Sequence, residues 1–161
     1  MEALQSRFVA AAASQAVLSP LRGIKDAPDM PLAAAVRCDP DLSAAGLAAE
    51  VDVAETFAEG LDPRDVLSPA QAASLFLYTE DSPAYRIENA KLMAEDREKV
   101  KPMFPLLKLQ LGALGALRDQ RVRAGGKVPT LYRGVKADIA AQYTQGKKVY
   151  WWAFSSCSRT M

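Results

Sequence analysis

Two short segments near the carboxyl end hold the residue types best suited to binding a phosphate-containing ligand. Residues 131–134 read Leu-Tyr-Arg-Gly, and residues 154–158 read Phe-Ser-Ser-Cys-Ser. The first segment puts Arg133 at the end of a predicted strand, and the second puts serines at the end of a strongly apolar one. A planar guanidinium can bind phosphate oxygens in a bidentate, charge-assisted way. The pairing therefore predicts a nucleotide site.

The elements that would position these residues are two strands, over residues 128–133 and 149–156, with a brief helix between them over residues 138–143. Trp152 and Phe154 share one face of the second strand, and its other face is apolar too. Such a strand belongs inside a sheet that is covered on both sides. Two strands alone would not be stable in water. We therefore expect further strands beyond the last residue of this sequence, which reads as cut short.

Three helices are predicted ahead of these strands. Ser68 is a favoured N-cap residue with proline after it, which indicates a helix start. The Ser-Pro pair at residues 82–83 starts a second helix in the same way. A third begins near residues 102–105, and its apolar positions recur at intervals of three and four: Phe104, Leu107, Leu111 and Leu114. Helices followed by strands predict an α+β fold class.

The amino-terminal part gives weaker signals. We expect residues 1–67 to be an alanine- and proline-rich lead-in, partly helical or disordered, before a domain over residues 68–161. A short helix fits residues 42–57. Residues 8–18 resemble a weak secretion signal, but an acidic residue precedes them and leucines are scarce. An amphipathic or partly ordered helix is the simpler interpretation of that stretch.

Composition excludes several classes of function. Twenty basic and 19 acidic residues leave a net charge of +1 with no block of like charge, so no nucleic acid or anionic membrane is expected as a partner. The absence of histidine removes Ser-His-Asp and Cys-His nucleophile systems and histidine-containing zinc sites. No apolar run approaches the roughly 18 residues that span a bilayer. Cys38 and Cys157 lack metal-ligand spacing, so no metal is expected, and they fit a reduced, cytoplasmic protein while leaving location open.

Each chemical signal also has an ordinary structural interpretation. Gly125 and Gly126 precede a lysine but lack the spacing and the preceding strand of a phosphate-binding loop. Arg133 taken alone would be a solvated or ion-paired arginine. The serines could simply satisfy backbone groups at a strand end, and the tryptophans could be core residues. Only the combination, in this order, favours a nucleotide site.

From about Leu75 to Ser158, the order of these parts resembles the arginine-directed mono-ADP-ribosyltransferases, the class named for an arginine, a serine and a glutamate. The Leu-Tyr-Thr sequence at residues 77–79, followed by Tyr85, Arg86 and Asn89, looks like the helical lead-in of that family. The Leu-Tyr-Arg-Gly segment looks like its first motif. The Phe-Ser-Ser-Cys-Ser segment looks like its Phe-Ser-Ser-Thr-Ser strand.

Two departures from the family pattern matter. Cysteine replaces threonine at Cys157, which keeps the volume but loses a strong hydroxyl donor and acceptor. More seriously, the family requires a Glu-x-Glu or Gln-x-Glu motif after the serine strand, and no glutamate lies between Arg133 and Met161. We therefore expect the catalytic carboxylate to lie outside the given residues and this fragment to be inactive.

The resemblance implies a fold and a reaction. The fold would be α+β, with the first strands of a mixed sheet that holds NAD as the substrate. The reaction would be NAD-dependent transfer of ADP-ribose, with inversion at the ribose carbon, to an arginine of a target protein. Cleavage of the nicotinamide–ribose bond develops positive charge on the sugar, so a carboxylate beneath that ring stabilises the transition state.

The resemblance also implies roles for individual residues. Arg133 would bind the diphosphate of NAD, and Gly134 would let the backbone approach the nicotinamide amide. Ser156 would position the ribose and the missing glutamate, with Ser158 in support. The wall of the nicotinamide pocket would be formed by Trp152 and Phe154.

A rival interpretation stays open. The chain could be a non-catalytic helical interaction module with a degenerate nucleotide pocket or none. The missing carboxylate and the apolar face predicted for residues 104–114 favour this alternative.

Overall fold

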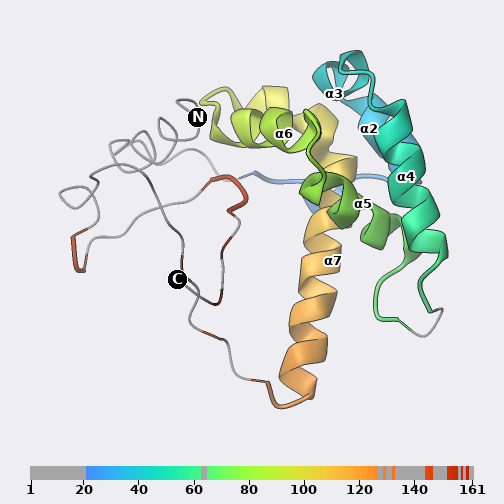
Figure 1. Cartoon of the computed structure of the whole chain (residues 1–161). Coiled ribbons are helices and arrows are strands. Elements are labelled where there is room, and N and C mark those ends of the chain that lie inside the picture. Colours follow the sequence, from blue (N-terminus) through green and yellow to red (C-terminus); the bar gives the residue numbers. More distant parts are fainter. Residues whose placement is uncertain are drawn as a thin grey trace. The chain divides into compact units, whose positions relative to one another are not determined.

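The computed structural model of the 161-residue chain describes residues 21–62 and 65–126, with isolated residues 129, 132, 144–146, 152–155, 157 and 159. Residues 20–127 form one compact unit, which contains all the helices drawn in Figure 1. The remaining residues belong to a second unit. Because so few residues of the second unit are described, the description of the fold that follows is limited to residues 20–127, the helical unit.

The described part of the chain is all-α, and the predicted α+β class is wrong for it. Within these residues no strand pairs with another to form a sheet. Residues 152–155, which belong to the second predicted strand, are not part of a strand. The physical reason is that this part buries its apolar surface through helix–helix contacts and needs no sheet. The elements, in chain order, are η1 (Ile24–Asp26), α2 (Leu32–Cys38), α3 (Pro40–Ala44), α4 (Ala48–Glu59), α5 (Pro69–Thr79), α6 (Ala84–Met93), η2 (Arg97–Met103) and α7 (Phe104–Arg123).

The two predicted Ser-Pro helix starts are confirmed. Ser68 forms a capping box at the start of α5: its hydroxyl accepts from the backbone N–H of Gln71 at 3.3 Å, and the Gln71 side chain accepts from the backbone N–H of Ser68 at 3.0 Å. At the start of α6, the hydroxyl of Ser82 accepts from the backbone N–H of Ala84 at 3.3 Å. The capping box fixes where α5 begins. The N-cap residue of α6 is Pro83, which forms no side-chain cap, and the Ser82 hydroxyl binds the first residue of α6 from one position earlier.

The segment before α5 is more ordered than its composition suggested. Leu32 of α2 and Leu42 of α3 are completely buried. Asp39 caps α3, since its Oδ1 accepts from the backbone N–H groups of residues 41 and 42 at 3.0 and 3.1 Å. Glu55 of α4 accepts from the backbone N–H of Ala33 at 3.2 Å, which caps the start of α2 from a neighbouring helix. Residues 21–62 therefore share one core with α5 and α7.

Helix α7 is the longest element, and α5 and α2 pack against it (Figure 1). Phe104 and Leu107 are buried, as predicted. The rest of the predicted apolar face is wrong, because Leu111 and Leu114 are each 44% exposed. The buried side of α7 continues instead at Gln110 and Ala113.

None of the helices in the described part of the chain has the length and apolarity required to cross a bilayer.

Candidate functional site

The most informative polar arrangement lies where α5 meets α6. The Nδ2 of Asn89 on α6 donates to the Tyr78 hydroxyl near the end of α5, at 2.9 Å. The ring of Tyr85 meets that of Tyr78 edge to face, with centroids 6.2 Å apart and planes at 70°. Three residues that the lead-in resemblance singled out are thus brought together in space. We call this group the α5–α6 corner.

The chain builds this corner through a tight reversal. Helix α5 ends because Glu80 is extended, with φ −67° and ψ 152°. The backbone N–H of Ser82 then donates to the carbonyl of Glu80 at 2.8 Å, and α6 starts at Ala84. Because the connection is so short, the end of α5 and the first turns of α6 must lie close together. Tyr78 and Asn89, 11 residues apart, can therefore form a hydrogen bond.

An exposed cation lies on the outer side of the corner. The Nε of Arg86 donates to the Tyr85 hydroxyl at 2.9 Å, and the guanidinium lies 5.2 Å from the centroid of that ring. The hydrogen bond to Tyr85, assisted by the carboxylate of Asp81 at 3.2 Å, raises the pKa of Arg86. The two aromatic rings can stack on a flat ring of a ligand, and the arginine beside them can attract an anionic group of the same ligand.

A fully buried carboxyl group lies on the inner side of α6. Glu88 Oε2 accepts from the Nε2 of Gln110 on α7 at 2.9 Å. The other carboxyl oxygen of Glu88 and the side-chain oxygen of Gln110 have no hydrogen-bond partner among the described residues. Burial raises the pKa of Glu88 to about 7, the Gln110 hydrogen bond opposes the shift, and the charge of Asp39 adds to it.

An ion pair holds the next turn of α6. The Nζ of Lys91 lies 2.7 Å from Asp39, which is completely buried, and 2.8 Å from Asp41. Burial works against the charge of Lys91, but its hydrogen bonds to the two aspartates outweigh it and raise the pKa of Lys91. Through these contacts α6 is fixed to α3 on one side and, at Glu88, to α7 on the other.

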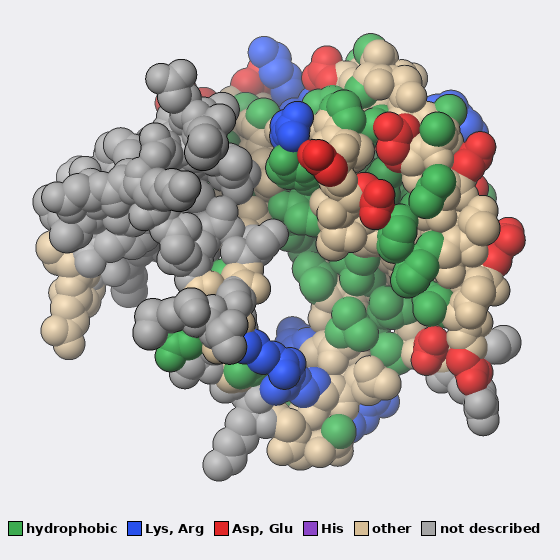
Figure 2. Space-filling model, viewed as in Figure 1, with side chains coloured by type: hydrophobic (Ala, Val, Ile, Leu, Met, Phe, Trp, Pro, Cys, Tyr) green, Lys and Arg blue, Asp and Glu red, His purple; other side chains and the backbone are tan. Residues whose placement is uncertain are grey.

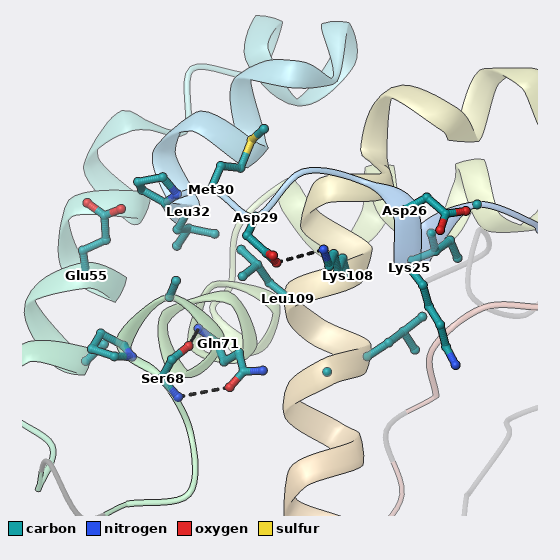
Figure 3. A pocket seen from close by; sticks show the side chains of 18 of the residues that line it. Lys25, Asp26, Asp29, Met30, Leu32, Glu55, Ser68, Gln71, Lys108 and Leu109 are labelled. Atoms are coloured by element: carbon teal, nitrogen blue, oxygen red, sulfur yellow. Dashed lines mark hydrogen bonds and ion pairs between the residues drawn. The ribbon is translucent and has the colours of Figure 1, made fainter.

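A cavity with a volume of about 1340 Å³ lies elsewhere in the helical unit. Figure 3 shows its labelled side chains, which come from the segment around η1 and from α2, α4, α5 and α7. Several of its polar groups already bind within the protein. Lys108 is 2.9 Å from Asp29 and donates to the carbonyl of Ala27 at 2.7 Å, while Glu55 and Ser68 cap helices. No catalytic combination of side chains emerges among the groups that line this open cavity.

The residues predicted to hold NAD are only partly described. Arg133, Gly134, Ser156 and Ser158 all lie outside the described residues. Trp152 and Phe154 are half-buried within the second unit. Cys38 and Cys157 are free, exposed thiols. In the described ranges, no group of three or more acidic or cysteine side chains is placed to hold a metal ion.

The sequence interpretation missed the buried polar contacts of α6. A signal for Glu88 was present, because it falls four residues after Ala84 and four before Leu92, both of which are buried. A glutamate on an apolar helix face predicts a buried carboxyl group with a shifted pKa. No comparable signal linked Lys91 to Asp39, which lies 52 residues earlier.

Comparison of the sequence with models of protein families and with curated proteins, and of the structure with solved structures, finds no match.

Proposed function

We propose that this chain carries the helical lead-in and the first nucleotide-binding motifs of an NAD-dependent, arginine-directed mono-ADP-ribosyltransferase. The observation that carries the proposal is the hydrogen bond from Asn89 to Tyr78, with the Tyr85 ring beside it. The sequence resemblance singles out the same three residues from their order along the chain. Their meeting at one corner supports a common role for the Tyr-Thr pair and the following helix.

The proposed chemistry uses residues that follow the helices. Arg133 binds the diphosphate of NAD, since a guanidinium can engage two phosphate oxygens at once. Ser156 positions the nicotinamide ribose, and Ser158 supports it. Transfer breaks the nicotinamide–ribose bond, releases nicotinamide, and joins the ribose carbon to a guanidinium nitrogen of the target protein, with loss of a proton. The stabilising carboxylate is not among residues 134–161, which contain no glutamate.

Calorimetric titration of the 161-residue chain with NAD tests the binding half of this proposal. We expect measurable binding that Arg133→Ala abolishes, because the diphosphate loses its bidentate partner. Arg123→Ala is the matched control, since Arg123 is an exposed arginine at the end of α7. Absence of NAD binding, or equal binding by Arg133→Ala and the parent chain, contradicts the proposal.

A turnover assay tests the catalytic half. With NAD and agmatine as a small guanidinium acceptor, we expect no transfer by residues 1–161, because the carboxylate needed beneath the ribose is missing from them. Robust transfer would refute the requirement for that glutamate. A Glu-x-Glu motif encoded roughly 35 to 50 residues further on, the space that two or three more strands need, would support the enzyme assignment.

A second candidate function is a non-catalytic helical interaction module with a degenerate nucleotide pocket or none. The observation that favours it is the set of large apolar side chains exposed on α4 and α7, including Phe57 at 46% and Leu114 at 44%. If the NAD titration gives no heat while the helical unit binds another protein chain, this candidate replaces the first.

A further inference from the structure

The cavity of about 1340 Å³ extends from α4, past the start of α5 and the side of α7, to η1 (Figure 3). Figure 3 places Glu55 at one end of it and Lys25 at the other. We call it the α4–η1 cavity. Its apolar lining between these ends includes Leu32, Ala58, Ala70 and Leu109.

The walls of this cavity are fixed by contacts within the protein. The Nζ of Lys108 donates to the carbonyl of Ala27 at 2.7 Å and lies 2.9 Å from Asp29, which ties the segment after η1 to α7. Glu55 accepts from the backbone N–H of Ala33 at 3.2 Å, which ties α4 to α2. A ligand that enters a preformed cavity has little of the protein to order, so more of its contact energy appears as affinity.

The α4 end of the cavity is acidic. Glu55 and Glu59 both line it and lie one helical turn apart. Neither forms an ion pair with any residue that the structure describes, and Glu55 uses only one carboxyl oxygen to cap α2. Helix α4 contains four acidic and no basic residues, and Figure 2 shows acidic side chains along that side of the helical unit. This end of the cavity therefore suits a cation.

The η1 end carries more positive than negative charge. Arg22 and Lys25 line it, and within the described ranges neither is in an ion pair. Asp26 lines the same end and offsets one of these two cations. Between the two ends, Lys108 and Asp29 neutralise one another. The α4–η1 cavity thus has an acidic end and a basic end, separated by an apolar floor.

Two hydrogen-bond donors line the cavity between its ends (Figure 3). Lys108 uses two of the three N–H donors of its ammonium group, at Ala27 and Asp29. Gln71 accepts from the backbone of Ser68 with its amide oxygen, which leaves its NH₂ group available. These donors can bind carbonyl oxygens of a ligand that lies along the cavity.

We propose that the α4–η1 cavity binds a short apolar peptide with free termini. The terminal ammonium group lies against the two α4 carboxylates, and the terminal carboxylate lies against Arg22 and Lys25. The volume exceeds the range of about 300 to 1,000 Å³ that is typical of sites for drug-sized ligands, so several residues fit. The opposite charges at the two ends set the direction of the peptide. The site lies within the helical unit and does not involve Arg133, so its failure would leave the NAD proposal untouched.

Calorimetric titration of the 161-residue chain with the tetrapeptide Leu-Ala-Ala-Leu, free at both ends, tests the proposal. We expect saturable binding. Acetylation of the amino end, or amidation of the carboxyl end, should raise the dissociation constant about tenfold, because each leaves the opposing charges of the cavity unpaired. If related peptides of three, four and five residues all fail to bind, or if blocking both ends changes nothing, the proposal is overturned.

Substitutions at exposed charged residues locate each end of the peptide. Glu59→Gln should raise the dissociation constant of the free peptide up to about fivefold and leave that of the acetylated peptide unchanged. Lys25→Gln should act in the same way on the free and the amidated peptide. Glu95→Gln is the matched control, since Glu95 is exposed and does not line the cavity. If Glu59→Gln weakens the free and acetylated peptides equally, or weakens neither, the assignment of the acidic end is wrong.

The apolar wall is tested by a matched pair of leucines on α7. Leu111 and Leu114 are each 44% exposed, but of the two only Leu111 lines the cavity. Leu111→Gln should therefore weaken peptide binding, because it removes apolar contact area, and Leu114→Gln should not. Far-UV circular dichroism establishes that each variant remains helical. Equal effects of the two substitutions would show that the peptide does not bind in this cavity.

Discussion

The buried carboxyl group of Glu88 makes the stability of the helical unit depend on pH in an unusual direction. Its pKa is about 7 in the folded protein against an ordinary value of 4.5. The folded state therefore holds the proton more tightly than the unfolded chain does. The stabilisation of the folded state by this tightly held proton is fully present below pH 4.5. It is lost as the pH rises toward 7, because the unfolded chain gives up the proton first and the folded carboxyl group ionises only near pH 7. At about 1.4 kcal/mol per pKa unit, the shift from 4.5 to about 7 corresponds to a loss of about 3 kcal/mol.

Glu88→Gln removes this dependence while preserving shape. An amide at this position can still accept from the Gln110 side chain, and its own NH₂ group can donate to the Gln110 oxygen, which has no partner among the described residues. Above pH 7 we expect the variant to be more stable than the parent chain by up to about 3 kcal/mol. Near pH 4.5 the two should differ little.

Urea unfolding followed by helical circular dichroism, at a series of pH values across this window, measures the effect. The quantity of interest is the difference in unfolding free energy between parent and variant, because other titrating groups contribute equally to both. Glu95→Gln is the control, since it makes the same substitution at an exposed glutamate. A difference between parent and Glu88→Gln that stays constant from pH 4.5 to pH 8 would refute the assignment of a raised pKa to Glu88.

Three further substitutions probe the contacts that hold α5, α6 and α7. Ser68→Ala should destabilise by about 1 kcal/mol, as loss of an N-cap hydroxyl does, and thermal unfolding with Ser68→Asp as the rescuing variant checks this. Lys91→Met should cost about 3 kcal/mol, because it leaves the buried carboxylate of Asp39 without its cation; urea unfolding of the Lys91→Met, Asp39→Asn double variant should recover part of that loss. Leu106→Ala should cost 2 to 5 kcal/mol, roughly the range for a buried leucine, and a loss below about 1 kcal/mol would contradict its place in the core.

How much of the fold could be predicted depended on how local each signal was. The Ser-Pro starts of α5 and α6 were recognised because an N-cap and a following proline act within one turn. The burial of Phe104 and Leu107 was recognised from helical spacing. The same spacing failed at Leu111 and Leu114, because a period fixes which residues share a face but not which face a neighbouring helix covers. The second predicted strand rested on an apolar run, which does not distinguish a buried strand from another buried segment, and its described residues 152–155 are not part of a strand.

The candidate site divides in the same way. The sequence alone selected Tyr78, Tyr85 and Asn89 and ordered them before Arg133 and Ser156, because motifs are patterns along the chain. The order of residue types along the chain also determined the helix starts. The amino-acid composition determined the absence of histidine chemistry and the near-neutral charge. Only the tertiary structure decided that Asn89 binds Tyr78, that Lys91 neutralises Asp39, and that α4 and η1 line opposite ends of one cavity. Those outcomes join residues from 11 to more than 50 positions apart, and such contacts depend on how helices pack against one another rather than on any local preference of the chain.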